Sequence, residues 1–227
     1  FTFLIFGDSQ STNYKVWGRT LHQAYQRHPE AAFMVNVGDL VDVGQSDKEW
    51  QGWLAGARGV IENIPVIPVV GNHETYTPNK GFSMPVFFTA QFKVPQNGPV
   101  GLKGQVYSFD YGNVHFSILD SQAGEERQFV PDMLEWQRVW LNRDLAASNK
   151  KWKLVFIHRP LYHNRAGERE AQLQGAFLDI LDKHHVDAVF SGHDHVYART
   201  VPLFEGMPVS AASPGTVYVT TGRSGTK

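Results

Sequence analysis

The chain has 227 residues, no cysteine and a formal net charge of −1. The near-neutral charge disfavours a dedicated nucleic-acid binder, which needs a large basic surface, and no apolar run approaches the ~20 residues that span a bilayer. Without cysteine, disulfides and thiolate metal sites are excluded, so any metal must be held by oxygen and imidazole ligands.

The length suits one domain with a buried core, which we assign to residues 1–227. Phe1 already lies inside an apolar run, and the chain ends soon after another. We therefore expect the native protein to extend beyond both ends, with room for a signal peptide or leader before residue 1.

Short β-rich runs alternate with longer segments of helical period along the chain. The runs predicted as strands are Phe1–Phe6, Ala32–Val37, Val66–Val70, Val106–Phe109, Val114–Leu119, Leu154–Ile157, Ala188–Phe190 and Val217–Thr221. Several are apolar on consecutive positions, which is typical of strands covered on both faces. The fourth and fifth runs are predicted to form a hairpin that turns at Tyr111-Gly112.

Three helices are predicted from apolar residues that recur at helical spacing. Their stripes are Trp17, Leu21, Ala24 and Tyr25 in the first, Met133, Trp136 and Trp140 flanked by Leu134, Leu141 and Leu145 in the second, which opens near Pro131, and Leu173, Phe177, Ile180 and Leu181 in the third. We interpret these stripes as core packing. Residues 75–104, rich in proline and glycine, are predicted as a long ordered loop that lines a site.

The alternation of strands and helices predicts an α/β fold. Because the hairpin adds antiparallel strands, we expect a mixed sheet, or two packed mixed sheets, between layers of helices.

Polar residues follow five of the predicted strands. The segments are Gly7-Asp8, Gly38-Asp39, Gly71-Asn72-His73-Glu74, His158 and Gly192-His193-Asp194-His195. In open α/β sheets ligands bind beyond the carboxyl ends of the strands, so we expect these side chains to meet at one rim. Glycine allows the tight turns and close approach that such a rim needs. Carboxylate, amide and imidazole donors together suit Mn, Fe, Zn or Co.

Each segment also has an ordinary structural interpretation. A lone Gly-Asp is usually a turn, Gly71-Asn-His-Glu74 could be a helix cap, and His158 could be a hydrogen-bonded core histidine. His193 and His195, in contrast, are expected to lie on the same side of an extended segment, which suits metal binding better than packing. Because all the segments follow strands, their combination favours a metal site over coincidence.

These motifs resemble the calcineurin-like metallophosphoesterase superfamily, whose pattern is Asp-x-His, Gly-Asp-x-x-Asp, Gly-Asn-His-Asp/Glu, a lone His and Gly-His-x-His. The purple acid phosphatase-like branch is the most similar, through Trp136-Gln-Arg-Val-Trp-Leu141, Val155-Phe-Ile-His-Arg-Pro-Leu-Tyr162 and Gly192-His-Asp-His-Val-Tyr-Ala-Arg199. The resemblance covers nearly the whole chain. It implies a four-layer sandwich, in which two packed mixed sheets are flanked by helices, and a dinuclear metal centre.

The resemblance also implies roles for individual residues. The implied metal ligands are Asp8 and His195 for the first ion, Asn72, His158 and His193 for the second, and Asp39 as the bridge between them. His73 should lie beside the substrate, with Asp42 as its carboxylate partner. The implied cofactors are two divalent or trivalent ions such as Mn, Fe or Zn.

Two positions depart from the family pattern. Gln10 stands where the superfamily usually has histidine, and we expect it to act as a weak ligand or to hold a water. Asp42 stands where purple acid phosphatases have a tyrosine ligand, so neither a charge-transfer colour nor a firmly held Fe(III) is expected.

The expected activity is phosphate-ester hydrolysis by in-line attack of a metal-bridging hydroxide, with protonated His73 assisting the leaving alkoxide. A phosphomonoesterase is favoured; a phosphodiesterase, including one for nucleotide or cyclic nucleotide substrates, is the alternative. A non-catalytic metal-binding scaffold on the same fold is a second alternative. A serine hydrolase is disfavoured because the chain has no Gly-x-Ser-x-Gly elbow.

Other polar residues are weaker candidates. His163 could contact substrate or be a surface histidine, and Arg165 and Arg199 could pair with phosphate oxygens. No site role is expected for the remaining histidines, which are His22, His28, His115, His184 and His185. The expected partner is a small phosphorylated substrate, and the branch resemblance implies an exported protein.

Overall fold

The computed structural model describes residues 1–163, 168–210 and 213–226, with the side chains of 168–170 left aside; Arg165 therefore lies outside the described residues. Its strands form two main sheets. The first is parallel and consists of β1 (Leu4–Phe6), β2 (Met34–Asn36) and β3 (Val66–Pro68), in that order. The second has the order β4-β5-β6-β7-β11-β8, from β4 (Tyr107–Tyr111), β5 (Val114–Ile118), β6 (Trp152–Phe156), β7 (Ala188–Ser191), β8 (Tyr197–Arg199) and β11 (Val217–Thr221).

The second sheet is mixed. Its strands β5, β6, β7 and β11 run parallel, whereas β4 and β8 pair antiparallel at the two edges. A separate small hairpin pairs β9 (Leu203–Phe204) with β10 (Met207–Pro208). In β4–β5, Tyr111 pairs with Val114, so the chain turns at Gly112-Asn113, one residue later than predicted.

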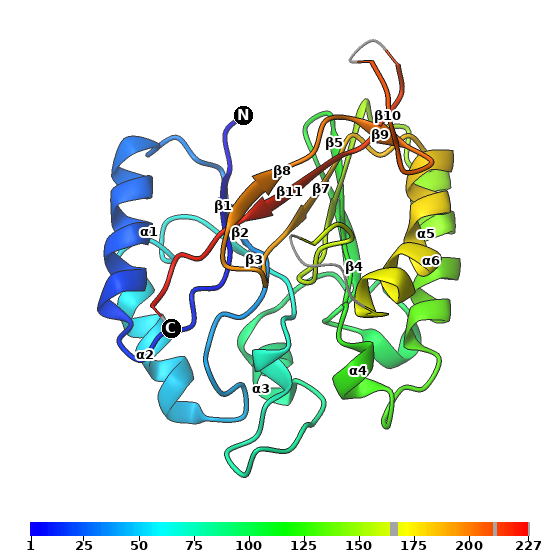
Figure 1. Ribbon diagram of the computed structural model, residues 1–227. Coiled ribbons are helices and arrows are strands. Elements are labelled where there is room, and N and C mark those ends of the chain that lie inside the picture. Colours follow the sequence, from blue (N-terminus) through cyan, green and yellow to red (C-terminus); the bar gives the residue numbers. More distant parts are fainter. Residues whose placement is uncertain (164–167, 211–212, 227) are drawn as a thin grey trace.

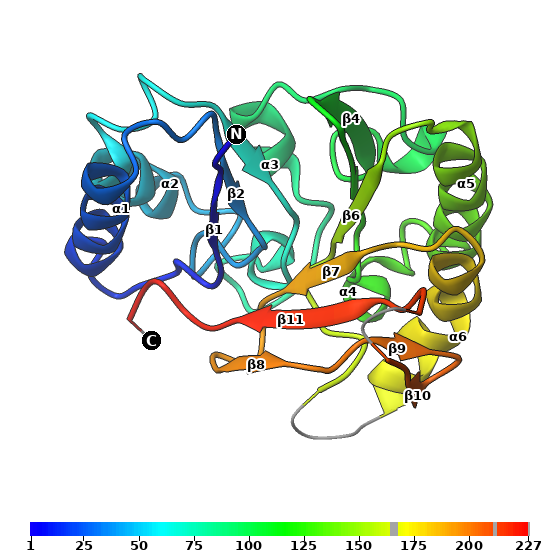
Figure 2. The ribbon, with the colours of Figure 1, turned by 90° about the horizontal axis from the view of Figure 1, so that it is seen from above.

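Helices cover the outer faces of both sheets, as Figures 1 and 2 show. The first sheet is covered by α1 (Lys15–Arg27) and α2 (Asp47–Ala57), and the second by α5 (Met133–Ala147) and α6 (Glu168–Lys183). Shorter elements are η1 (His73–Thr75), α3 (Val86–Gln91), η2 (Val100–Leu102) and α4 (Ala123–Glu126). The predicted α/β architecture of two packed sheets between helices is confirmed. Within the described residues, no helix is both long and apolar enough to cross a bilayer.

The central core between the sheets explains the consecutive apolar positions. In and beside β2, Phe33 and Val35 face the second sheet while Met34 packs toward α1 and α2. Side chains alternate along a strand, so a strand buried on both faces must be apolar throughout. Phe33 and Phe116 meet edge to face across the two sheets, with ring centroids 5.5 Å apart.

Helix α2 was not predicted, although Trp50, Trp53 and Ala57 give it a buried face. Gly52 and Gly56 lower its helix propensity, which obscures the signal. A Cβ on Gly56 would lie 3.0 Å from the carbonyl of Tyr14, and one on Gly18 would lie 2.9 Å from the carbonyl of Gly56. The same glycines that weaken the helix signal in the sequence therefore allow α1 and α2 to pack closely.

Two further expectations need correction. The loop predicted at residues 75–104 contains α3, whose Phe88 packs into the core beside α2. In α5 the fully buried face consists of Met133, Gln137, Leu141 and Leu145, whereas Trp136 is 43% exposed. The predicted stripe through Trp136 and Trp140 therefore lies beside the buried face of the helix, and does not form its centre. The amide of Gln137 binds the backbone of residue 120, which explains a polar residue on that face.

His115 on β5 lies in an ion network on the second sheet. Its Nδ1 is 2.7 Å from a carboxylate oxygen of Asp110, and its Nε2 is 2.9 Å from one of Asp144. Burial lowers the pKa of His115, but the hydrogen bonds to Asp144 and Asp110 outweigh burial, so the pKa lies above the ordinary 6.5. The network therefore stabilises the fold when the imidazole is protonated.

We expect this stabilisation to depend on pH. Because the folded-state pKa is raised, the contribution is fully present below pH 6.5 and is lost as pH rises through the folded-state value. His115→Gln should lower the free energy of unfolding by about 1 kcal/mol in acid and by less in alkali. Urea titrations at several pH values would measure this difference. His22→Gln on α1 is the control, and an equal effect of His115→Gln at every pH would contradict the prediction.

Candidate metal centre

Five parallel strands deliver the predicted donors to one region. Asp8 follows β1, Asp39 follows β2, and η1 with the preceding Asn72 follows β3. From the second sheet, His158 follows β6, and the segment containing His193 and His195 follows β7. The carboxyl ends of both sheets thus converge, which is the arrangement that the strand-end pattern predicted.

The converging side chains form two donor groups that share one carboxylate. Asp39, His158 and His193 each offer a ligand atom within 4.8 Å of the others, and so do Asp8, Asp39 and His195. Both groups are buried on their carboxylate side, since Asp8 is 1% and Asp39 2% exposed. One carboxylate with a donor group on each side is an arrangement that suits two neighbouring cations.

His158 is oriented by the backbone of the opposite sheet. Its Nδ1 lies 2.8 Å from the carbonyl of Val37, so an Nδ1–H donates there, and in the neutral ring Nε2 keeps the lone pair that a metal can bind. That Nε2 lies 3.2 Å from both Asp39 Oδ2 and Asn72 Oδ1, and 3.3 Å from His193 Nδ1. Acceptor atoms cannot donate hydrogen bonds to one another. A group of acceptors this close together is therefore better explained by a cation that they bind jointly.

The first donor group centres on Asp8. Both of its carboxylate oxygens accept the backbone N–H of His193 at 3.0 Å, and Oδ1 lies 3.4 Å from His195 Nε2. Gln10 lies beside this group and donates its Nε2–H to Asp39 Oδ2 at 3.2 Å. Within the described residues the buried Gln10 Oε1 has no hydrogen-bond partner. An orphaned amide oxygen at this place fits a neighbouring cation or its water.

The charges of the site reinforce one another. Burial raises the pKa of Asp39, but the neighbouring His158 outweighs it and the net shift is downward, so Asp39 is ionised. Burial lowers the pKa of His158, but Asp39 raises it, to about 9, so without a cation His158 Nε2 carries a proton beside Asp39, and a bound cation would take the place of that proton. Burial and the charge of His158 lower the pKa of His193 to about 2, so its imidazole is neutral and free to bind a metal. The donor set therefore fits two cations.

Four of these residues have strained backbones. Asp8, Asp39, His193 and His195 all have φ between 50° and 67°, in the left-handed region that non-glycine residues rarely adopt. The segment of His193 and His195 is therefore not extended, and the expectation of an extended segment was wrong. Such conformations cost about 1–3 kcal/mol each and cluster at functional sites. The strain concentrated on these side chains supports a functional role for them.

Glycines give the donors the space they occupy. A Cβ on Gly38 would lie 2.4 Å from His158 Nδ1, and one on Gly192 would lie 2.5 Å from Asp8 Oδ2. Gly38 also has a φ of 94°. The glycines of the motifs thus allow the two sheets to approach each other at their carboxyl ends.

Gly38→Ala should therefore destabilise the protein by on the order of 3 kcal/mol, from the left-handed φ and the clash with His158 together. Gly175→Ala, in the middle of α6, is the matched control because a Cβ there meets nothing within 4 Å. It should raise stability by about 0.5–1 kcal/mol. Thermal unfolding of both variants checks this, and equal stabilities would refute the packing argument.

His73 lies beside the shared carboxylate with Asp42 behind it. Its Nδ1 is 2.6 Å from the carbonyl oxygen of Asp42 and 3.3 Å from its carboxylate. Its Nε2 is 3.9 Å from Asp39 Oδ2, and its backbone N–H donates to Asp39 Oδ1 at 2.9 Å. An Nδ1–H held by Asp42 directs Nε2 toward the donor groups. The structure thus brings the predicted pair together.

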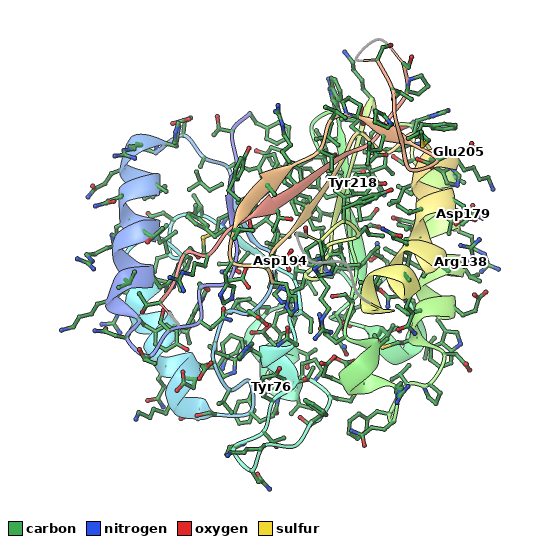
Figure 3. All side chains as sticks on the ribbon, in the orientation of Figure 1. Tyr76, Arg138, Asp179, Asp194, Glu205 and Tyr218 are labelled. Atoms are coloured by element: carbon green, nitrogen blue, oxygen red, sulfur yellow. The ribbon has the colours of Figure 1, made fainter. Side chains whose placement is uncertain are left out.

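Among the weaker candidates, His163 lies near the centre and its Nδ1 is 2.9 Å from Asp194 Oδ1. Figure 3 labels Asp194 beside the carboxyl ends of the strands. The ring centroid of His163 is 6.1 Å from that of His193. Arg199 belongs to the edge strand β8 and lines a hollow on the face of the second sheet with Ile5, Phe190 and Val219, apart from the donor groups.

Two positioning residues were missed at the sequence level. The buried carboxylate of Glu74 accepts the backbone N–H groups of Asp39, Leu40, Val41 and Gly71, at 2.7–3.3 Å, and so anchors the loop that carries Asp39. Tyr76 accepts a hydrogen bond from Asn72 Nδ2 at 2.9 Å, which turns the oxygen of that amide toward His158. Glu74 already stood inside the Gly-Asn-His-Glu motif, whereas Tyr76 carried no signal.

Known proteins resemble this chain in sequence. The family model for calcineurin-like phosphoesterases matches residues 1–197. Purple acid phosphatase 21 of Arabidopsis thaliana is 29% identical, over 99% of this chain and 50% of the relative.

Two solved structures share the fold. A purple acid phosphatase from yellow lupin (Lupinus luteus) seeds superposes with a TM-score of 0.74 at 21% identity, over 99% of this chain and 44% of that one. A dimetal phosphatase from Danio rerio superposes with a TM-score of 0.69 at 22% identity, over 99% of this chain and 88% of that one. The chain spans about half, or less, of the length of the curated relatives that it matches.

Proposed function

The chain belongs to the calcineurin-like phosphoesterase family, and on that premise we propose that it is a dinuclear metal-dependent phosphomonoesterase. The observation that carries the proposal is the pair of donor groups sharing Asp39, with His73 beside them. The proposed ligands are Asp8 and His195 for the first cation, Asn72, His158 and His193 for the second, and Asp39 for both.

The two cations, once bound, would offset the negative charge of the phosphate ester and acidify the attacking water. The protein's own residues would complete the reaction. His73 Nε2 faces the donor groups, and the carboxylate of Asp42 is placed to attract positive charge on its ring. As water adds to phosphorus and the phosphorus–oxygen ester bond breaks, His73 would give a proton to the leaving alkoxide.

The donor set also bears on metal identity. Oxygen and imidazole ligands suit Mn, Fe or Zn, and Gln10 is proposed as a weak ligand or water holder in the first group, because its buried oxygen has no partner among the described residues. Asp42 occupies the place of the tyrosine ligand of purple acid phosphatases, and it faces His73. We therefore expect the metal-loaded protein to be colourless.

The substrate is proposed to be a small phosphate monoester, with His163 as a candidate contact. The named relative is a purple acid phosphatase, which supports a monoesterase over a diesterase. A non-catalytic scaffold is disfavoured because the two donor groups and His73 are all in place. Export from the cell is proposed from the same relationship, and cell fractionation would test it.

Removing and restoring metal tests the proposed function. The protein should lose hydrolysis of phosphate monoesters after chelation and regain it with Mn²⁺, Fe²⁺ or Zn²⁺, with two ions per chain by elemental analysis. A panel of mono-, di- and cyclic nucleotide esters should favour the monoesters. Full activity in the metal-free protein, or preference for diesters, would contradict the proposal.

A further inference from the structure

A pocket of about 490 Å³ opens beside His73 and Asp42. The rest of its lining comes from Val43 and from the segment 76–82, which contributes Tyr76, Lys80 and Phe82. The volume lies within the range of about 300–1,000 Å³ that small-molecule sites occupy. In Figure 3 Tyr76 is labelled at the base of the loop that projects below the sheets. A group entering this pocket would lie next to the proposed proton donor.

The wall is an ordered turn. Tyr76 and Phe82 pair as an antiparallel bridge, and the N–H of Thr77 donates to the carbonyl of Gly81 at 3.0 Å. The N–H of Gly81 in turn donates to the hydroxyl of Thr77 at 2.9 Å. Because these bonds close the turn, the pocket is formed before any ligand arrives, which lowers the entropy cost of binding.

Two aromatic rings line the pocket and one of them is tied to the metal centre. Tyr76 and Phe82 have ring centroids 5.7 Å apart. The ring of Tyr76 also lies 4.5 Å from that of His73, and its hydroxyl holds the amide of Asn72. Phe82 is 45% exposed. An exposed aromatic ring on an ordered turn beside a reactive centre is typical of a ligand contact.

We propose that this pocket holds the leaving group of the ester and that Tyr76 and Phe82 select a flat aromatic one. This inference rests on the proposed phosphoesterase function. The phosphate would lie at the donor groups, and the bond to the leaving oxygen would point past His73 into the pocket. Aromatic rings packed offset or edge to face gain interaction energy in addition to that from buried surface area. A saturated group of the same size does not have this additional energy. Lys80 at the rim adds positive charge for an acidic substituent.

Three monoesters with similarly basic leaving alcohols test the proposal: benzyl, cyclohexylmethyl and ethyl phosphate. The metal-loaded protein should have the highest kcat/KM for benzyl phosphate. Phe82→Ala should lower that value by about 10-fold and leave ethyl phosphate within about 2-fold. Phe129→Ala is the matched control, because Phe129 is 47% exposed and is not among the pocket-lining residues; it should change none of the three.

Equal loss on all three esters in Phe82→Ala, or no loss on benzyl phosphate, would overturn the proposal. Equal rates for benzyl and cyclohexylmethyl phosphate would overturn the preference for aromatic groups. If no ester is hydrolysed, the proposed function is wrong. The proposal for the pocket is then tested by the binding of phosphonates, which are not hydrolysed. Calorimetry should show benzylphosphonate binding more tightly than ethylphosphonate, with the difference abolished by Phe82→Ala; equal binding would refute the pocket.

Discussion

Asp39→Asn is expected to lower kcat/KM for phosphate monoesters by at least about 10³-fold and to reduce the metal content below two ions per chain. The substitution keeps the size of the side chain and an oxygen that can accept the backbone N–H of His73. It removes the negative charge that both donor groups share. The expected loss is therefore one of metal binding and catalysis, with little change of fold. Steady-state kinetics and elemental analysis on the same preparation would measure both.

Asp179→Asn provides the control for Asp39→Asn. Asp179 is an exposed carboxylate on α6 that pairs with Arg138 of α5 (Figure 3), and exposed pairs contribute at most about 1 kcal/mol. This variant should keep its metal and its activity. If Asp39→Asn also kept two ions and full activity, the shared carboxylate could not be the bridge between two cations, and the proposed centre would be wrong.

His73→Asn is expected to slow the reaction without removing metal. General acid assistance is typically worth about 10²–10⁴-fold, and that loss should appear with alkyl phosphates, whose alkoxides need a proton to leave. p-Nitrophenyl phosphate should lose much less, because p-nitrophenolate is stable without a proton. The ratio of the two losses is the measurement that identifies a proton donor.

His22→Asn on α1, outside the two donor groups, is the control for His73→Asn. It should change neither substrate's rate. An equal loss on both substrates in His73→Asn would show that the residue binds phosphate or positions another group, and would remove its proposed role as the acid. If His73→Asn instead lost its metal, His73 would be a residue needed for metal binding, and its role as proton donor would not be supported.

The sequence singled out side chains that the structure brings together, because their chemistry and their place are both local properties. Asp8, Asp39 and His158 each follow a short apolar run, and strands that run parallel bring their carboxyl ends to one edge. The glycines before Asp39 and His193 were interpreted as sites of close approach, and the structure gives each a specific neighbour in His158 and Asp8. Residue type and adjacency to a strand were sufficient to predict that these side chains lie close together.

Other features depend on contacts between distant segments. Glu74 anchors the Asp39 loop through backbone N–H groups more than thirty positions away, and nothing near Glu74 in the chain shows this. Helix α2 was hidden because Gly52 and Gly56 lower its propensity, yet packing against α1 at those glycines stabilises it. The pocket beside His73 exists only because residues 76–82 close into a turn that faces it.

By itself, the sequence determined which side chains are candidate metal ligands, which strands they follow and which class of fold brings them together. It could do so because the residue type and the spacing of apolar residues are both read from short stretches of the chain. The tertiary structure alone decided that Asp39 lies within reach of both donor groups, that His73 turns its Nε2 toward them and that aromatic rings wall the space beyond. Those relations are distances between groups as far apart in the chain as residues 8 and 195. Such distances are set by the packing of two sheets on a shared core.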